Sequence, residues 1–193
     1  QFIADDPQIQ INGYNYHRSF DGWKHIRGQE RDRFITDPVD VDFPCSPEKL
    51  RAPYKTLKKR YFKNISIRQS EKDCFVSQTM AGAVDWLERN YKHDNFLLYI
   101  DTFDPHEPWD APQWYVDLYD PGYEGEEVIY PVYGSCDYLS ESELNHCRAL
   151  YAGEVTLVDK WVGKVLDRVK DLGIEDETAI LFTSDHGFYF GEH

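Results

Sequence analysis

The sequence predicts an α/β fold with a mostly parallel sheet flanked by helices, and three observations support this prediction. Two short apolar runs, 96–100 and 179–183, have the length and composition of strands buried in a protein interior. A long amphipathic helix pattern lies between them. A strand, a crossover helix and a second strand form a βαβ unit, whose two strands run parallel. The chain has 193 residues, which suits one domain.

The N-terminal part, residues 1–67, is rich in Pro, Gly, charged and aromatic residues without a sustained period. We expect irregular, loop-rich structure there. A helix is predicted over 71–91, because apolar residues recur at helical spacing after a capping box formed by Ser70 and Asp73. The first predicted strand, 96–100, follows this helix.

A second capping box, Ser140 with Glu143, begins the long helix after a loop rich in Pro, Asp and Tyr. Gly173 stands where a helix C-cap belongs, and the second predicted strand comes next. Residues 68–193 are therefore predicted to form a helix-strand-helix-strand core.

Composition excludes several classes of partner. The formal net charge of −14 disfavours a nucleic-acid surface, because a phosphate backbone requires a clustered basic footprint. No apolar stretch approaches the roughly 18 residues of a membrane span. The four cysteines contain no C-x-x-C pair, so we interpret them as unpaired structural thiols. Composition says nothing about the oligomeric state.

The predicted topology brings two polar segments together. Parallel strands have their carboxyl ends on the same edge of the sheet, where open α/β folds bind ligands. The segment after 96–100 reads D-T-F-D-P-H-E-P-W, and the segment after the second strand reads T-S-D-H-G. Both should open into one crevice.

Three residues in these segments are candidates for chemistry. Asp185 and His186 offer a carboxylate oxygen and an imidazole nitrogen, which together can bind a divalent cation that polarises an anionic ester. The alternative for this pair is an aspartate that caps a turn beside an exposed histidine. His106 lies in a loop stiffened by Pro105 and Pro108, and its imidazole suits general acid work or hydrogen bonding to an anion. The alternatives for His106 are a surface loop histidine, or a histidine that packs against Trp109.

Four segments resemble bacterial sulfatases of the alkaline phosphatase superfamily. The segment F-T-S-D-H-G-F-Y-F-G-E-H resembles their second metal-binding segment, and F-L-L-Y-I-D-T-F-D-P-H-E-P-W resembles their central histidine segment. F-D-G-W-K-H-I-R-G-Q-E-R-D and Y-A-G-E-V-T-L-V-D-K-W-V-G are similar to two further stretches of the family. The segments occur in family order over about residues 15 to 193. The resemblance implies an alkaline phosphatase/sulfatase-like fold, of which 1–193 is the central part of the catalytic domain.

The resemblance also implies a reaction, the hydrolysis of sulfate esters of small molecules or carbohydrates. By position, Asp185 and His186 would be metal ligands, most simply for calcium, although many relatives have Asn where His186 stands. His106 would contact the sulfuryl group or protonate the leaving group, and His193 would line the substrate site. The nucleophile would be a formylglycine made in a C-x-P-S-R motif upstream of this chain. We therefore expect a fragment that is inactive alone.

Asp5, Asp6 and Cys45 imitate the family's first metal carboxylates and its nucleophile. Around Cys45 the sequence C-S-P-E-K lacks the Ser and Arg of C-x-P-S-R, so we interpret all three residues as a coincidence.

Two other functions stay open. A phosphonate monoester or phosphodiester hydrolase of the same superfamily shares the D-H-G pair, and manganese would then be the expected metal. A non-catalytic carbohydrate-binding pseudoenzyme could use the aromatic residues of the loop after His106, namely Trp109, Trp114, Tyr115 and Tyr119.

Overall fold

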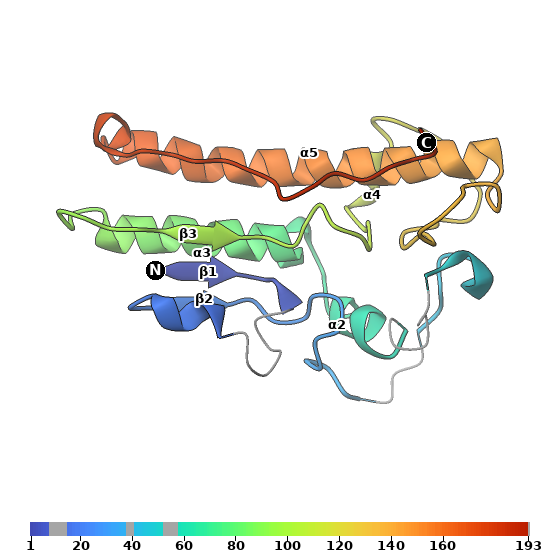
Figure 1. Cartoon of the computed structure of the whole chain (residues 1–193), viewed down its shortest axis with the longest axis horizontal. Coiled ribbons are helices and arrows are strands. Elements are labelled where there is room, and N and C mark those ends of the chain that lie inside the picture. Colours follow the sequence, from blue (N-terminus) through green and yellow to red (C-terminus); the bar gives the residue numbers. More distant parts are fainter. Residues whose placement is uncertain (8–14, 38–40, 52–57, 193) are drawn as a thin grey trace.

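The computed structural model describes residues 1–7, 15–37, 41–51 and 58–192, and its centre is a small parallel sheet (Figure 1). Strands β1 (Phe2–Ala4), β2 (Trp23–His25) and β3 (Tyr99–Asp101) pair in the order β2-β1-β3. Both pairings are parallel, and Ala4 lies opposite His25 on one side and Asp101 on the other. The predicted α/β class with a parallel sheet is confirmed.

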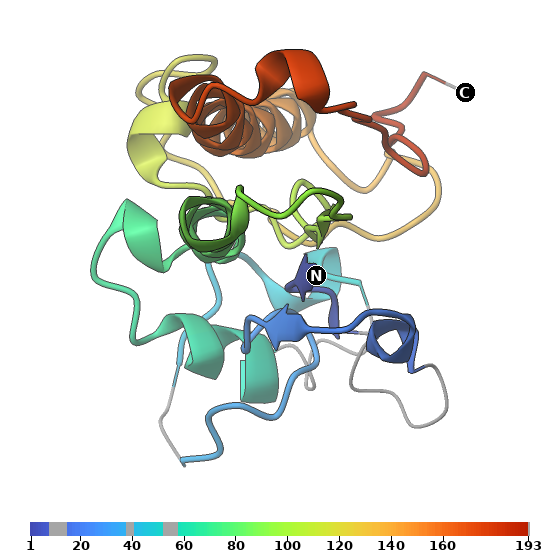
Figure 2. The same cartoon turned by 90° about the vertical axis from the view of Figure 1, so that its left-hand side faces the viewer.

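Two long helices cover the sheet. Helix α3 (Phe75–Asn90) contacts β1 and β3, and helix α5 (Glu141–Asp171) packs along α3 (Figures 1 and 2). The short helix α4 (Gln113–Val116) also contacts α5. The remaining helical turns are α2 (Lys63–Ile65), the π-helical turn Lys58–Phe62 and the 3₁₀ turns Tyr16–Ser19, Pro47–Lys49, Glu71–Asp73 and Glu175–Glu177.

The core has two main parts. One lies between the sheet, α3 and α5, where Ile3, Leu87 and Leu157 are almost completely buried. The other surrounds Trp109, which has no exposed surface. Each large apolar side chain buried in this way contributes about 1.5–3 kcal/mol from removal of its surface from water. The second part of the core fixes the loop that carries His106, because Trp109 belongs to that loop.

Both predicted helices form, although α3 begins at Phe75, four residues later than predicted. The Ser140 hydroxyl accepts the backbone N–H of Glu143, and the Glu143 carboxylate accepts the N–H of Ser140, which completes the capping box of α5. Gly173 follows α5 with φ +69°, the left-handed conformation that ends many helices. The Ser70 and Asp73 box is also present, one turn before α3 begins.

The second predicted strand is wrong. Residues 179–183 are extended but belong to no strand, and Leu181 and Phe182 are 90% and 76% exposed. This segment runs back along α5 toward the C-terminus (Figure 1). An apolar run becomes a strand only where a neighbouring strand accepts its backbone hydrogen bonds, and the described residues offer it none.

The first predicted strand forms at a shifted position. Strand β3 begins at Tyr99, three residues later than the apolar run, and Tyr99 is 49% exposed. Burial on both faces was the expectation, but β3 is only partly covered. The Tyr99 ring lies 5.4 Å from Phe2 and 5.8 Å from Phe20 on one face, and Ile100 is half-buried against the core on the other.

The N-terminal part contains more order than its composition indicated. Strands β1 and β2 both lie within residues 1–67, alongside the irregular segments expected there. No helix of the described residues is long and apolar enough to cross a bilayer.

Candidate active site

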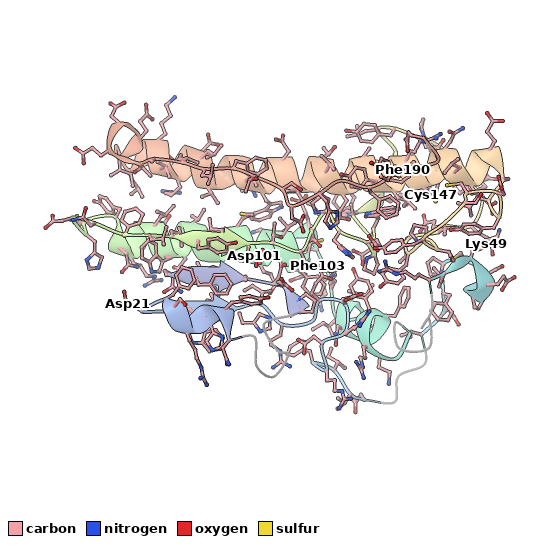
Figure 3. The ribbon with its side chains drawn as sticks, in the orientation of Figure 1. Asp21, Lys49, Asp101, Phe103, Cys147 and Phe190 are labelled. Atoms are coloured by element: carbon pink, nitrogen blue, oxygen red, sulfur yellow. The ribbon has the colours of Figure 1, made fainter. Side chains whose placement is uncertain are left out.

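The carboxyl edge of the sheet gathers acidic and imidazole side chains. His25, Ala4 and Asp101 end the three strands side by side, and Asp5 and Asp6 continue β1 beyond this line. Asp101 lies at the start of the loop that leads to His106, next to Phe103 (Figure 3). This edge is the place where the parallel topology predicts a ligand site.

Asp5 is a structural residue. Its side chain is completely buried and accepts hydrogen bonds from Thr79 Oγ1 at 2.9 Å, Thr102 Oγ1 at 3.0 Å and the backbone N–H of Phe103. Burial, followed by the charge of Asp104, raises the pKa of the Asp5 carboxyl well above its usual range. The side chain therefore joins the end of β1 to α3 and to the loop after β3, which supports its interpretation as a coincidental match.

Asp185 lies near this edge. Burial, followed by the nearby charges of Asp6 and Asp185, raises the pKa of Asp101 to about 6. The ring of Phe188 meets Trp109 edge to face at a centroid distance of 4.9 Å, and Phe190 lies 5.4 Å from the same ring. The segment around Asp185 and the His106 loop therefore lie side by side, as the sequence predicted, although the strand expected to bring them together is absent.

Asp185 and His186 are arranged like a chelating pair. The Asp185 Oδ1 atom accepts the backbone N–H of His186 at 2.8 Å, and His186 Nδ1 lies 3.0 Å from the Gly187 carbonyl oxygen. The other two atoms, Asp185 Oδ2 and His186 Nε2, are 3.5 Å apart. Metal–oxygen and metal–nitrogen bonds of about 2.0–2.2 Å at a near-tetrahedral angle give a similar separation. The role of the pair as ligands of a cation stays a prediction.

The described residues supply no complete metal site. Within 1–7, 15–37, 41–51 and 58–192, no group of three or more His, Cys, Asp or Glu side chains converges closely enough to hold an ion. Asp185 and His186 are both exposed, so their remaining coordination positions face solvent.

His106 is held in a defined orientation. Its ring stacks on Phe103 at a centroid distance of 4.1 Å, and its Nδ1 atom lies 2.6 Å from the carbonyl oxygen of Glu107. A carbonyl oxygen only accepts hydrogen bonds, so this contact requires the proton on Nδ1. The Nε2 atom is then the nitrogen left to meet a substrate.

The structure describes Cys45 but not His193, the two remaining residues that were named from the sequence. Cys45 is buried, and this burial raises the pKa of its thiol to about 12, so it is a poor nucleophile at neutral pH. Its interpretation as a coincidental match to the family's nucleophile stays a prediction. All four cysteines are unpaired, as predicted. His193 lies outside the described residues.

The sequence model of the sulfatase family matches residues 10–193. The chain belongs to the sulfatase family. An arylsulfatase of Clostridium perfringens is 27% identical over 128 residues, which cover 58% of this chain and 26% of that protein. The choline-sulfatase of Rhizobium meliloti is 25% identical over 214 residues, which cover 92% of this chain and 41% of that protein.

Among solved structures, the phosphonate monoester hydrolase of Agrobacterium radiobacter matches the whole chain with a TM-score of 0.59 and 16% identity, over 45% of its own length. This likeness establishes the fold. The chain spans less than half the length of each of these three proteins.

Sequence reasoning did not find the side chains that surround His106. Glu107 is buried to 1% exposure directly beside His106, and it contacts Arg51 and Tyr133. Little in the sequence singles out Glu107, because its partners Arg51 and Tyr133 lie in distant parts of the chain. The proximity of Asp101 to Asp185 also depends on the tertiary structure alone.

Proposed function

We propose that this chain is the central part of a metal-dependent hydrolase that cleaves sulfate esters. Its membership of the sulfatase family supports the reaction class. The observation that carries the proposal is the approach of the Asp185 segment to the His106 loop through Trp109, Phe188 and Phe190. In this proposal a pair of cation ligands and a fixed imidazole act at the same edge of the sheet.

The proposal gives each residue a role. Asp185 and His186 hold a divalent cation, which supplies positive charge to the sulfuryl oxygens when bound. His106, with its proton on Nδ1, presents Nε2 to the ester and, once protonated there, gives a proton to the leaving alcohol oxygen. His193 lines the substrate site. The nucleophile, a formylglycine in this proposal, comes from outside the chain, and so do the further ligands of the cation.

A longer protein that contains this chain tests the proposal. It should hydrolyse an aryl sulfate, whereas the chain alone should not. Replacing Asp185 with Asn should lower kcat/KM by at least about a hundredfold and weaken cation binding measured by calorimetry. Asp176→Asn, at an exposed aspartate on the same C-terminal segment, is the control and should change neither. Full turnover by the Asp185→Asn protein, or turnover by the chain alone that depends on Cys45, would refute the proposal.

A second candidate is a phosphonate monoester or phosphodiester hydrolase. His186 favours it, because an imidazole nitrogen suits manganese or zinc better than calcium, which takes oxygen ligands. His186→Asn separates the two candidates. A calcium sulfatase should keep most of its activity with an amide oxygen at this position, whereas a manganese phosphoesterase should lose it.

A further inference from the structure

Glu107 carries a buried carboxylate that the roles assigned above leave unused. Its Oε1 atom lies 2.7 Å from Arg51 Nη1 and accepts a hydrogen bond from the Tyr133 hydroxyl at 2.5 Å. Its Oε2 atom lies 3.4 Å from His106 Nδ1. A buried carboxylate costs folding free energy unless it is paired, and Arg51 provides the pairing charge for Glu107. The contact of Glu107 with His106 is not needed for that pairing, so it calls for a separate explanation.

Arg51 is itself held from several sides. Its guanidinium lies 4.1 Å from the ring centroid of Tyr130 and 3.9 Å from that of Tyr133. The Tyr130 hydroxyl donates to Glu30 Oε1 at 2.7 Å, which fixes that ring in turn. A guanidinium stacked between two rings has little freedom to rotate, so the Glu107 carboxylate that it holds is fixed as well.

The fixed carboxylate faces the protonated nitrogen of His106. Since Nδ1 already donates to the Glu107 carbonyl oxygen, the carboxylate at 3.4 Å adds a negative charge on the same side of the ring. Both favour a proton on Nδ1 and disfavour the other tautomer, which would place the proton on Nε2. The stacked ring of Phe103, labelled in Figure 3, restricts tilting of the imidazole.

We propose that Arg51, Glu107 and Tyr133 form a positioning group that fixes the orientation and tautomer of His106. The three residues act through the histidine and do not touch the ester. The proposal rests on the proposed function in its kinetic consequences, but its effect on the tautomer of His106 is independent of any reaction.

Glu107→Gln alone is an ambiguous test, because it leaves Arg51 with only the more distant carboxylate of Glu30, at 4.0 Å, and destabilises the fold. The double variant Arg51→Met with Glu107→Gln removes both members of the ion pair and should recover most of the stability of the wild-type protein, because Glu30 keeps its contact with Arg31 at 3.6 Å. A purely structural role then predicts that kcat recovers too. A positioning role predicts that kcat stays about tenfold below wild type in the double variant, with KM within about twofold.

A second carboxylate of the chain provides a matched control. Glu71 also pairs with a basic side chain and a tyrosine hydroxyl, Lys160 Nζ at 2.9 Å and Tyr115 at 2.9 Å. It lies before α3, and the hydrogen bonds of its carboxylate within the described residues go to side chains other than His106. Lys160→Met with Glu71→Gln removes one positive and one negative charge, as the Arg51 and Glu107 double variant does. It should leave kcat within about twofold of wild type.

Ring nitrogen NMR of the complete protein, labelled with ¹⁵N-histidine and assigned with His106→Gln, gives the second readout. In the neutral wild-type protein His106 should show a protonated Nδ1 and an unprotonated Nε2. In the double variant the backbone carbonyl of Glu107 remains, but the carboxylate no longer fixes the ring, so the tautomer protonated on Nε2 should appear beside the first one. Recovery of kcat in the double variant, or an unchanged tautomer, overturns the proposal. If the wild-type protein hydrolyses no ester, the proposed function fails while the NMR result still decides this inference.

Discussion

Glu154 is a buried carboxyl group that lies close to other acidic side chains. It is 2% exposed, and its carboxyl accepts the backbone N–H of Asp110 at 3.2 Å. The guanidinium of Arg68 donates to both carboxylate oxygens of Asp110 at 2.9 Å. Its positive charge offsets part of the negative charge of the acidic side chains near Glu154. Burial, followed by the charges of Asp104 and Asp110, raises the pKa of Glu154 well above its usual range.

A raised pKa predicts a definite pH dependence of stability. The folded state binds the Glu154 proton more tightly than the unfolded state, so this contribution is complete below the ordinary glutamate pKa of about 4.3 and declines as the pH rises toward the folded value. Glu154→Gln, which keeps an acceptor without the charge, should therefore raise the free energy of unfolding by on the order of 1 kcal/mol at pH 7 and change it little at pH 4.

Urea unfolding at both pH values measures this difference. Asp159→Asn, at an exposed position on the same helix, serves as the control and should show no such pH dependence. Equal effects of Glu154→Gln at pH 4 and pH 7 would contradict the assignment of a raised pKa.

At the scale of elements, helix α5 approaches α4 closely at one glycine. A Cβ atom added at Gly153 would lie 3.1 Å from the backbone nitrogen of Val116 and 3.3 Å from the carbonyl carbon of Tyr115. Backbone atoms cannot rotate away from such a contact as a flexible side chain can. Gly163, in the same helix, has nothing within 4 Å of the corresponding position.

These two glycines make a matched pair of substitutions. Gly163→Ala should stabilise the protein by about 0.5–1 kcal/mol, because alanine loses less backbone entropy than glycine in a helix. Gly153→Ala should destabilise it by about 1–3 kcal/mol despite the same gain, because the added methyl group overpacks the contact with α4. Thermal unfolding measures both effects, and stabilisation by Gly153→Ala would show that the helices separate easily.

Local patterns predicted the helices well, because capping boxes and apolar periodicity act within a few residues. They failed for the strands, which depend on partners elsewhere in the chain. Strands β1 and β2 have only three residues each, too few to show a period of their own. In the site, His106 stood out because two prolines flank it, whereas the ion pair between Arg51 and Glu107 joins segments that no local pattern connects.

At the scale of the whole molecule, the extended run Ile180, Leu181 and Phe182 leaves a large apolar surface exposed, at 56%, 90% and 76%. Exposed apolar surface of this kind promotes association with other chains.

The chain alone should therefore self-associate as its concentration rises. Replacing Leu181 and Phe182 with serine should reduce this association in sedimentation velocity without loss of the helical signal in circular dichroism. Tyr189→Ser, at a residue 72% exposed outside the run, should have a smaller effect. Equal association of the two variants would assign the association to another surface.

The ion pair of Arg51 also constrains how this protein can change over time. It joins an early, loop-rich stretch to the loop that bears His106, so the two stretches are not free to diverge independently. Substitutions that loosen the packing around Arg51 should therefore be tolerated only together with changes around His106.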